Sequence, residues 1–383
     1  MTQFYQLGGA EKLDVDLAVN LNKRGLHVDI LSMYSADSLA VMEAKKGLLL
    51  KGIPSVDFLG LNLGPSIMSV CKSIYKLRKL IQLEKYDIVV TSMVPPAIIA
   101  SWAVKGTQAR QVAGLHQVFN KTRDKSRHYK LWMLSAKFNR QIRYYAITEY
   151  VAKSWNSFSN TPPQHVRKIY NSISDDYFDV ALDQSCIRKE VGIPEGTKLA
   201  IYVGRLAAYK GIDTIFDALF PVLKKQNLVL LYVGRPDFFV KGTKEMLQNI
   251  QDRIINEDLG HKVKFLPHRD DIPQLMASSD VLVHPSRMEG FGLTLVEAMA
   301  AGLPIVASNV EAIPEVLSGT NSLMVQPDDP KSLREMVLVT LNLPAHDLKL
   351  CIEKGRSRSK NFQSNTRADQ LLKLFEDVVC NDF

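Results

Sequence analysis

The chain has 383 residues, of which 46% are hydrophobic and 23% charged, and its formal net charge is +8. This composition is ordinary for a soluble globular protein, and the length is large for one core, so we expect two domains. The four cysteines lack metal-binding spacing, and no apolar run is long enough for a membrane span. Since the amino terminus also lacks the apolar core of a signal peptide, we expect a cytoplasmic protein with reduced thiols.

The basic excess is concentrated in the first half. Residues 101–170 contain thirteen Lys or Arg against two acidic residues, Asp124 and Glu149. Such a surface suits phosphate-rich partners: an anionic membrane, a nucleic acid or a phosphorylated acceptor. A basic surface that only keeps the protein soluble is the alternative, and the composition leaves both open.

The amino terminus contains a glycine pair, Gly8-Gly9, followed by apolar residues at helical spacing from Leu13 to Leu21, with Gly25 as the stop. Only Thr2–Gln6 precede the pair, and they are too polar for a convincing central strand. We therefore expect either a reading frame that begins upstream of Met1 or a short, irregular first strand.

Strand-like and helical runs then alternate. We expect strands at His27–Met33, Val56–Leu59, Asp87–Ser92, Gln111–Leu115, Tyr144–Ile147 and Val166–Tyr170. We expect helices at Glu43–Lys51, Ser66–Leu83 and Ser126–Arg143, and strand, turn and helix within Ile88–Val104. Alternation of this kind predicts a parallel, doubly wound sheet.

Two of these helices are basic and amphipathic. Ser66–Leu83 sets apolar Ile67, Val70, Ile74, Leu77 and Ile81 against Lys72, Lys76 and Lys79, and Ser126–Arg143 has a similar pattern. Such a stripe usually faces a core, but a membrane-surface role is the alternative.

His116 follows the strand Gln111–Leu115 at its carboxyl end, where α/β sheets bind ligands. A polar, acidic stretch at Ser172–Ser185 then indicates a linker. The expected domains are 1–171 and 172–358, followed by a terminal helix in 359–383.

The second half repeats the alternation. We expect strands at Lys198–Val203, Leu228–Val233, Val263–Leu266, Val281–His284, Pro304–Ser308 and Ser322–Val325. We expect helices at Ile212–Lys225, Thr243–Asp258, Ile272–Ser278, Leu293–Ala301, Lys331–Leu341, Ala345–Lys360 and Asn365–Val379.

The segment Pro285–Ser308 is the most informative. Its loop carries Glu289, its helix carries Glu297, and Gly290 and Gly292 let a ligand approach the backbone at the helix start. For a lone glutamate, a solvated charge is the ordinary interpretation.

Two glutamates separated by seven residues, with Gly290-Phe291-Gly292-Leu293 between them, resemble the motif of the retaining GT-B glycosyltransferases of family four. Gly204-Arg205 and Lys210-Gly211, upstream, match the family's diphosphate-binding arginine and lysine. The resemblance implies two Rossmann-like domains facing a cleft, with the last helix packing on the first domain.

The resemblance also implies residue roles. Arg205 and Lys210 would neutralise the donor diphosphate, Glu289 would accept from sugar hydroxyls, and Glu297 would accept from the ribose. His116 would line the donor-sugar pocket. Backbone contacts to the donor are expected from Gly8, Gly9, Gly204, Gly234, Phe291, Gly292, Leu293 and Thr294. Two cations and a helix terminus can replace a divalent metal, so we expect no metal and no cofactor.

The expected activity is retaining transfer of a sugar from a nucleotide sugar, with UDP-sugars favoured, to a hydroxyl of a lipid-linked or polysaccharide acceptor. A catalytically impaired scaffold that binds carbohydrate or membrane is the alternative. The chain lacks the G-x-G-x-x-G of NAD-linked oxidoreductases and the P-loop of NTPases. We expect no nucleic-acid partner, a monomer or homodimer, and cytoplasmic localisation, with peripheral contact to the inner membrane face left open.

Overall fold

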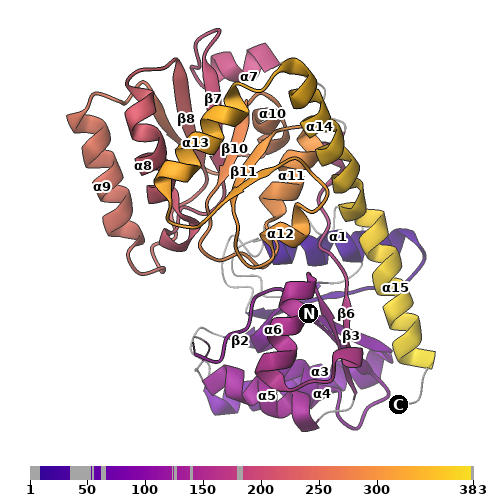
Figure 1. Ribbon diagram of the computed structural model, residues 1–383. Coiled ribbons are helices and arrows are strands. Elements are labelled where there is room, and N and C mark those ends of the chain that lie inside the picture. Colours follow the sequence, from indigo (N-terminus) through magenta and orange to yellow (C-terminus); the bar gives the residue numbers. More distant parts are fainter. Residues whose placement is uncertain are drawn as a thin grey trace. The chain divides into compact units, whose positions relative to one another are not determined.

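The computed structural model describes residues 9–34, 53, 56–61, 66–122, 124, 127–138, 141–178 and 184–380. Contacts divide the chain into unit 1, Met1–Ser172 with Ser364–Phe383, and unit 2, Ile173–Gln363. Both units contain parallel strands alternating with helices (Figure 1), which confirms the predicted α/β class. Gly8, the expected strand Thr2–Gln6 and the expected helix Glu43–Lys51 lie outside the described residues.

Unit 1 contains two sheets among the described residues, with orders β1-β2 and β3-β4-β5-β6, and every pairing is parallel. Its strands are β1 (Ile30–Tyr34), β2 (Val56–Leu61), β3 (Ile88–Thr91), β4 (Arg110–Leu115), β5 (Ile142–Ala146) and β6 (Val166–Lys168). Its helices are α1 (Gly9–Lys23), α3 (Ile67–Glu84), α4 (Val94–Ala103), α5 (Arg127–Phe138), α6 (Glu149–Ser159), the 3-10 turn η1 (Pro163–His165) and α15 (Ser364–Cys380).

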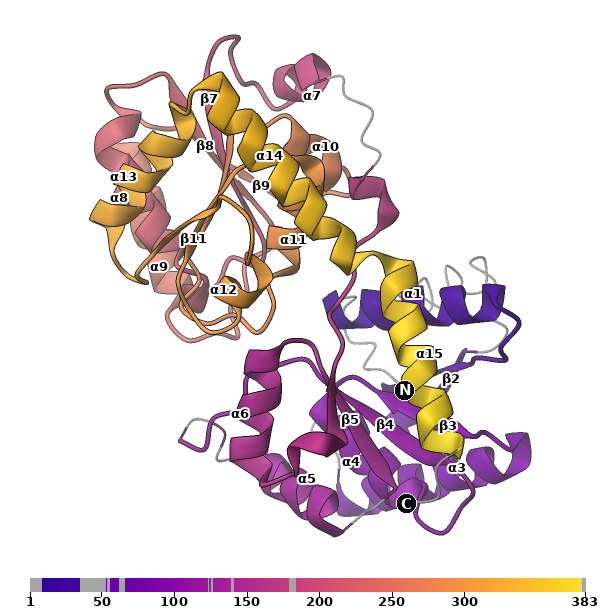
Figure 2. The same ribbon diagram turned by 45° about the vertical axis from the view of Figure 1, so that its right-hand side comes forward.

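Helices cover both faces of the unit 1 strands. Leu31 and Met33 of β1 pack with α3 and α4, whereas Ile30 packs with Val15 and Ala18 of α1. The terminal helix α15 contacts α1 and β4 (Figure 2), and its buried Arg367 donates to the Leu13 carbonyl at 2.9 Å. The end of the chain is therefore part of the core of unit 1.

Unit 2 has one six-stranded parallel sheet of order β12-β11-β10-β7-β8-β9. The strands are β7 (Lys198–Val203), β8 (Leu228–Val233), β9 (Val263–Leu266), β10 (Val281–His284), β11 (Ile305–Ser308) and β12 (Leu323–Val325). The α-helices are α7 (Gln184–Glu190), α8 (Ile212–Leu223), α9 (Thr243–Asn256), α10 (Ile272–Ala277), α11 (Leu293–Ala301), α12 (Ile313–Val316), α13 (Pro330–Leu341) and α14 (Ala345–Ser359), and the 3-10 turns are η2 (Asp175–Tyr177), η3 (Ala208–Lys210) and η4 (Lys360–Phe362).

The unit 2 sheet lies between two helical layers. One layer contains α8, α9 and α13, and the other contains α10, α11 and α14 (Figure 1). All six residues of β8 and all four of β10 and β11 are buried, as continuous apolar runs predict for parallel strands. Burial on both faces fixes the carboxyl ends of these strands, and these ends carry the candidate site.

Three expectations for unit 1 were wrong in part. The helix expected at Ser126–Arg143 ends at Phe138, because Ile142 already pairs with Gln111 of β4. The strand expected from His27 begins only at Ile30, because the Asn22 side chain bonds both backbone groups of Val28. Ile67, expected on the apolar stripe of α3, is 85% exposed, since it lies in the first turn of the helix.

The helix α6 was not expected from the sequence. Thr148 caps it by accepting from the amide of Val151, Asn160 ends it in a left-handed conformation, and Trp155 buries its inner face. Thr148 and Asn160 are typical cap residues, so the sequence contained a signal for this helix.

Candidate active site

The strand order of unit 2 reverses at β7, because β8 and β9 lie on one side of it and β10, β11 and β12 on the other. In open α/β sheets, ligands bind outside the carboxyl ends of the strands at such a reversal. The loops that leave β7, β8 and β10 carry Gly204-Arg205, Gly234 and Pro285–Gly292. These loops meet at the same sheet edge.

Glycines let the β7 and β8 loops approach each other closely. A Cβ on Gly234 would lie 1.9 Å from the carbonyl oxygen of Gly204, so no side chain fits there. Leu206 forms a parallel bridge with Pro236, and the Tyr202 hydroxyl donates to the carbonyl of Arg205 at 2.8 Å. The backbone that carries Arg205 is therefore fixed on two sides.

Arg205 extends from this loop with its side chain 66% exposed. Its guanidinium lies 2.9 Å from an oxygen of Asp237 and donates to the Tyr209 hydroxyl at 2.8 Å. A planar guanidinium held in this way is available for bidentate contacts to phosphate oxygens.

Lys210 and Glu289 form a shielded ion pair, with Nζ 2.6 Å from Oε2 and side chains 15% and 14% exposed. Burial raises the pKa of Glu289, but the Lys210 charge and hydrogen bonds from His284 and Lys210 outweigh it and hold the pKa well below its usual range. Glu289 is therefore a carboxylate at neutral pH. The residue expected to bind phosphate and the residue expected to bind sugar are thus direct partners.

His284, the last residue of β10, supports this pair. Its Nε2 lies 3.1 Å from Glu289 Oε2 and 3.2 Å from Ser286 Oγ. Burial lowers the pKa of His284, although Glu289 opposes this shift. A neutral imidazole beside a carboxylate carries its proton on the nitrogen that faces the carboxylate, so Nε2–H donates to Glu289.

Hydrogen bonds and ion pairs also hold the backbone around Glu289 in place. Its amide donates to Glu311 Oε2 at 2.7 Å. Arg287 contacts Asp213 at 2.9 Å and Asp328 at 2.7 Å, and it donates to the carbonyl of Ala208. The loop before α11 and the loop that carries Lys210 therefore form one connected unit.

The helix α11 begins beside these charges. Gly292 adopts a left-handed conformation at its start, and the Thr294 hydroxyl donates to the carbonyl of Val203 at 3.3 Å. Phe291 is buried, with its ring edge-on to Phe362 at 5.6 Å between centroids. The first turn of α11 thus lies next to the end of β7, and the helix dipole favours an anion there.

Glu297 lies in the second turn of α11. Tyr177, in η2, forms a hydrogen bond with its carboxylate, and burial followed by this charge raises the pKa of the Tyr177 hydroxyl. Tyr177 therefore stays a neutral donor that orients Glu297.

The remaining predicted residues lie in unit 1. Gly9 begins α1, and His116 follows β4 with Nε2 3.1 Å from the Tyr145 hydroxyl. Burial and the Arg367 charge lower the pKa of His116 to about 3, so its imidazole is neutral.

The sequence contains one Asp-x-Asp spacing, Asp14-Val15-Asp16, and it lies within α1. Asp14 accepts from the Ser92 hydroxyl. No group of three or more potential metal ligands was found among His, Cys, Asp and Glu of the described residues.

The structure brings Arg205, Lys210 and Glu289 to one sheet edge with the start of α11, and it places Glu297 on that helix. Sequence reasoning missed four supporting residues: Asp237, His284, Arg287 and Tyr177. Only His284 had a usable signal, because it ends a predicted strand directly before the motif. The roles of the other three depend on contacts with residues distant in sequence, which no local pattern indicates.

Two family models match the chain, one described as glycosyltransferase family 4 over residues 7–177 and one as glycosyl transferases group 1 over residues 183–358. A glycosyltransferase of Methanocaldococcus jannaschii of uncharacterized function is 34% identical over 46% of this chain and 45% of its own length. The N-acetyl-alpha-D-glucosaminyl L-malate synthase of Bacillus anthracis is 26% identical over 57% of this chain and 54% of its own. The chain thus spans about half the length of these curated relatives.

Solved structures share the whole fold. A glycosyltransferase from Rickettsia africae matches with a TM-score of 0.83 at 20% identity, covering 100% of this chain and 98% of that one. Anabaena Alr3699/HepE in complex with UDP-glucose matches with a TM-score of 0.81 at 21% identity, covering 98% of both chains. Taken with the two family models, this shows that the chain belongs to the group 1 glycosyl transferases, the GT-B glycosyltransferases of family 4.

Proposed function

We propose that this protein transfers a sugar from a nucleotide sugar, preferably a UDP-sugar, to a hydroxyl of a saccharide or lipid-linked acceptor, with retention at the anomeric carbon. The observation that carries the proposal is the shielded Lys210–Glu289 pair beside Arg205 and the start of α11. Anabaena Alr3699/HepE, which shares the fold, was solved with UDP-glucose. This favours a UDP-sugar as the donor.

In this mechanism the bond between the anomeric carbon and the leaving phosphate oxygen breaks as the acceptor oxygen bonds on the same face. The leaving phosphate oxygen takes the proton of the acceptor hydroxyl. Arg205, Lys210 and the amides at the start of α11 stabilise the negative charge on the departing diphosphate. A unit charge about 4 Å from a phosphate oxygen contributes on the order of 4 kcal/mol at an effective dielectric near 20.

In this proposal Glu289 binds the transferred sugar. The donor phosphates compete with its carboxylate for the Lys210 ammonium, so the carboxylate becomes available to accept from sugar hydroxyls. His284 keeps Glu289 in place during this exchange, because its Nε2–H donates to the same oxygen. Glu297, oriented by Tyr177, accepts from the ribose hydroxyls.

We further propose that no metal ion is needed, since two cations and a helix terminus can together stabilise a diphosphate. From the family resemblance we also propose donor contacts for His116 and Gly9.

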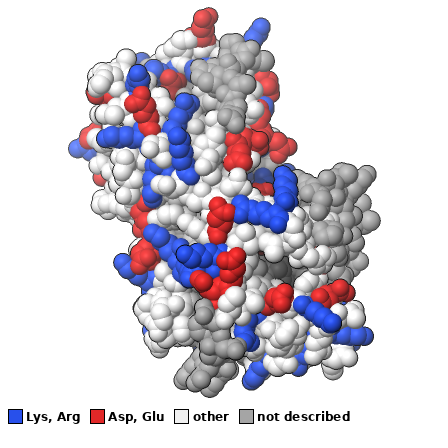
Figure 3. Space-filling view, turned by 90° about the vertical axis from the view of Figure 1, so that its right-hand side faces the viewer, with Lys and Arg blue, Asp and Glu red and all other residues white. Residues whose placement is uncertain are grey.

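We also propose an anionic membrane surface as the location of the acceptor. The outer side of α3 presents exposed Lys72, Lys76 and Lys79 together with Met68 and Tyr75, which are 69% and 70% exposed. Such a helix can lie on an anionic bilayer. No helix in the described part of the chain has both the length and the apolarity to span one. On the face drawn in Figure 3, basic and acidic side chains are interspersed. The basic residues of the sequence come with no nucleic-acid-binding motif, so we propose no nucleic-acid partner.

The test is donor turnover. The protein is incubated with UDP-, GDP- and ADP-sugars, with and without EDTA, and release of the nucleoside diphosphate is measured with methanol as a surrogate acceptor. We expect turnover with a UDP-sugar, unaffected by EDTA, and a methyl glycoside with the donor's anomeric configuration. UDP binding without any turnover would favour the scaffold alternative, and loss of turnover in EDTA would exclude the metal-free mechanism.

A further inference from the structure

A chain of hydrogen-bonded polar side chains in unit 1 ends on His116. It consists of Asp14 in α1, Ser92 after β3, Tyr145 in β5 and His116 after β4. The Ser92 hydroxyl donates to Asp14, and it also forms a hydrogen bond with the Tyr145 hydroxyl. The Tyr145 hydroxyl lies 3.1 Å from His116 Nε2. The polar chain therefore connects a carboxylate with an imidazole across three strands' ends and one helix.

Gly114 makes room for the contact between Tyr145 and His116. A Cβ on Gly114 would lie 2.8 Å from His116 Nε2 and closer still to the Tyr145 hydroxyl, so a side chain there would displace both. Tyr145 is fully buried, and its ring lies edge-on to the imidazole at 5.7 Å between centroids. The packing around these two rings therefore fixes the nitrogen that Tyr145 contacts.

The number of protons along the polar chain determines its direction. The Asp14 carboxylate only accepts, and Ser92 has one hydroxyl proton, which it donates to Asp14. Ser92 can then only accept from Tyr145. Tyr145 also has one hydroxyl proton, so it accepts from His116. The proton of the neutral imidazole is therefore on Nε2.

Arg367 of α15 supports this direction. Its guanidinium can only donate, and it lies 3.5 Å from the Tyr145 hydroxyl oxygen. Burial raises the pKa of the Tyr145 hydroxyl, so Tyr145 keeps its proton. Burial, followed by the Arg367 charge, lowers the pKa of His116, so the ring stays neutral. A neutral imidazole with its proton on Nε2 has a lone pair on Nδ1.

The Nδ1 side of His116 can receive a ligand. Among the described residues no hydrogen bond to Nδ1 is found, and His116 is partly exposed. A cavity of about 10 Å³ is lined by Ser92, His116 and Gln117, among others. It has room for one water-sized group, such as a hydroxyl.

We propose that Tyr145 and Ser92 are positioning residues, which hold the proton of His116 on Nε2 so that Nδ1 accepts a hydrogen bond from a hydroxyl of the transferred sugar. The contact to the sugar rests on the proposed function. The position of the proton rests only on the hydrogen bonds of unit 1.

The experiment reads the position of this proton directly. The whole chain is labelled with nitrogen-15 in its histidines, and the His116 signals are assigned by their absence from the spectrum of His116→Asn. The chemical shifts of Nδ1 and Nε2 report which nitrogen carries the proton. Spectra, Tm and donor kinetics are compared for the parent protein, Ser92→Ala and Tyr145→Phe.

We expect the proton on Nε2 in the parent protein. Ser92→Ala removes the acceptor of the Tyr145 proton, so Tyr145 donates to Nε2 instead and the His116 proton moves to Nδ1. A loss of packing alone would not exchange the two tautomers. Ser92→Ala and Tyr145→Phe should each lower kcat/KM for the donor by about tenfold, the scale of one hydrogen bond.

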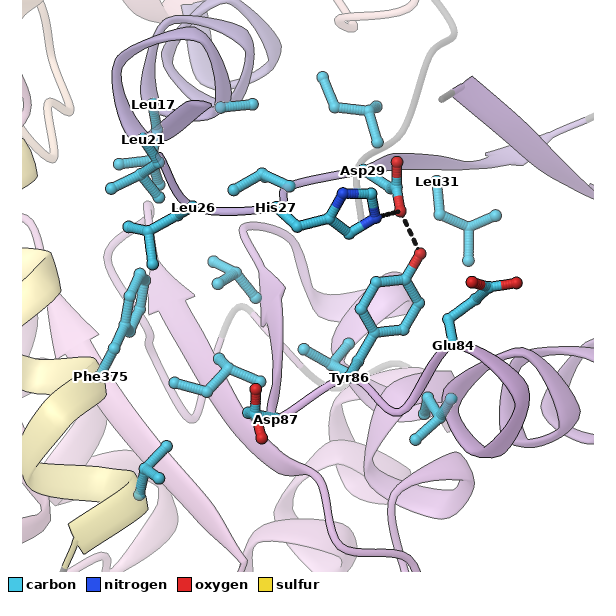
Figure 4. Close-up of a pocket in the computed structure, with 18 of the residues that line it drawn as sticks. Leu17, Leu21, Leu26, His27, Asp29, Leu31, Glu84, Tyr86, Asp87 and Phe375 are labelled. Atoms are coloured by element: carbon cyan, nitrogen blue, oxygen red, sulfur yellow. Dashed lines mark hydrogen bonds and ion pairs between the residues drawn. The ribbon is translucent and has the colours of Figure 1, made fainter. Parts of the chain in front are cut away.

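Two tyrosine substitutions in the same unit are matched controls. Tyr144 is adjacent in β5, and its hydroxyl is buried without a hydrogen-bond partner in the described structure. Tyr86, before β3, donates to Asp29, which His27 Nε2 also contacts at 2.9 Å (Figure 4). Tyr144→Phe and Tyr86→Phe each remove one hydroxyl outside the polar chain. They should change neither the tautomer nor kcat/KM.

The proposal is overturned if the parent protein carries the His116 proton on Nδ1, or if Ser92→Ala keeps it on Nε2. An exchange of tautomers without a fall in kcat/KM would overturn the contact to the sugar. If no nucleotide sugar is turned over, the proposed function fails, and the spectra alone then confirm or overturn the positioning role of Tyr145 and Ser92.

Discussion

The two units are built on the same plan but differ in how their described strands are arranged. Unit 2 has six parallel strands in one sheet, and β8, β10 and β11 are buried along their whole length. In unit 1 the described strands form two sheets, a pair and a group of four. The difference teaches why the candidate site of unit 2 is well defined: continuous strand pairing holds the ends of β7, β8 and β10, and hence the loops that carry Arg205 and Glu289, at one sheet edge.

The units also differ in their ionisable groups. In unit 2 the shielded carboxylate of Glu289 is matched by the Lys210 ammonium. In unit 1, His116 is kept neutral and bonds to the Tyr145 hydroxyl. If this contrast is correct, charge changes in unit 2 should affect turnover strongly, whereas His116 should show its effect in the acid stability of unit 1.

The largest effect is expected from Lys210→Ala. The substitution removes one cation from the proposed diphosphate site and leaves the shielded Glu289 carboxylate without the Lys210 ammonium. We expect kcat to fall by roughly 10² or more and the free energy of unfolding of unit 2 to fall by about 3–5 kcal/mol. Steady-state kinetics and urea unfolding measure both. Lys224→Ala is the control, because Lys224 pairs with Glu257 on the surface. This substitution should change kcat and the free energy of unfolding only slightly.

Arg205→Ala should lower kcat by about 10² with little change in stability, because the side chain is largely exposed. The same assays test it beside Lys210→Ala. A kcat within about twofold of the parent would mean that Arg205 is only a solvated residue of the loop and would remove it from the mechanism.

The lowered pKa of His116 predicts that the stability of unit 1 depends on pH. Its pKa is lowered from 6.5 to about 3, so below pH 6.5 the unfolded chain binds a proton that the folded chain does not. The free energy of unfolding should therefore fall by about 1.4 kcal/mol for each pH unit on acidification between these values. His116→Asn should remove this part of the slope in urea titrations. An unchanged slope would show that His116 titrates normally in the folded state.

The smallest effects are expected from substitutions of the residues proposed to bind the donor ribose and to orient that contact. Glu297→Ala should raise KM for the donor with kcat nearly unchanged, because ribose contacts change little during the reaction. Tyr177→Phe removes the hydrogen bond that orients Glu297 and should raise KM by about fivefold, which corresponds to about 1 kcal/mol. A fall in kcat with constant KM would place Tyr177 nearer the reacting atoms.

The sequence predicted unit 2 better than unit 1 for a physical reason. Strands such as Leu228–Val233 are apolar throughout and bounded by polar loops, so their limits follow from local composition. In unit 1, Ile142 and Tyr144 continue the apolar spacing of the preceding helix, and only their pairing with β4 shows that the helix has ended. Long-range pairing overrides local pattern in such places.

The same distinction applies to the site. Arg205, Lys210, Glu289 and Glu297 were predicted because their spacing around glycines resembles the family motif. The direct Lys210–Glu289 contact was not predicted, since it joins residues 79 positions apart in the sequence. Tyr177 and Asp237 were missed because nothing in their own neighbourhoods indicates a partner.

Arg287 has a consequence for protein engineering. One guanidinium joins the η3 turn, the start of α8 and the loop before α13, through Ala208, Asp213 and Asp328. A chimera that imports a foreign loop around Glu289 would separate this arginine from acceptors encoded elsewhere in the host. Segments containing all four positions would have to be exchanged as a set, so the smallest transplantable module is defined by the bonds of Arg287 rather than by the boundaries of the glutamate motif.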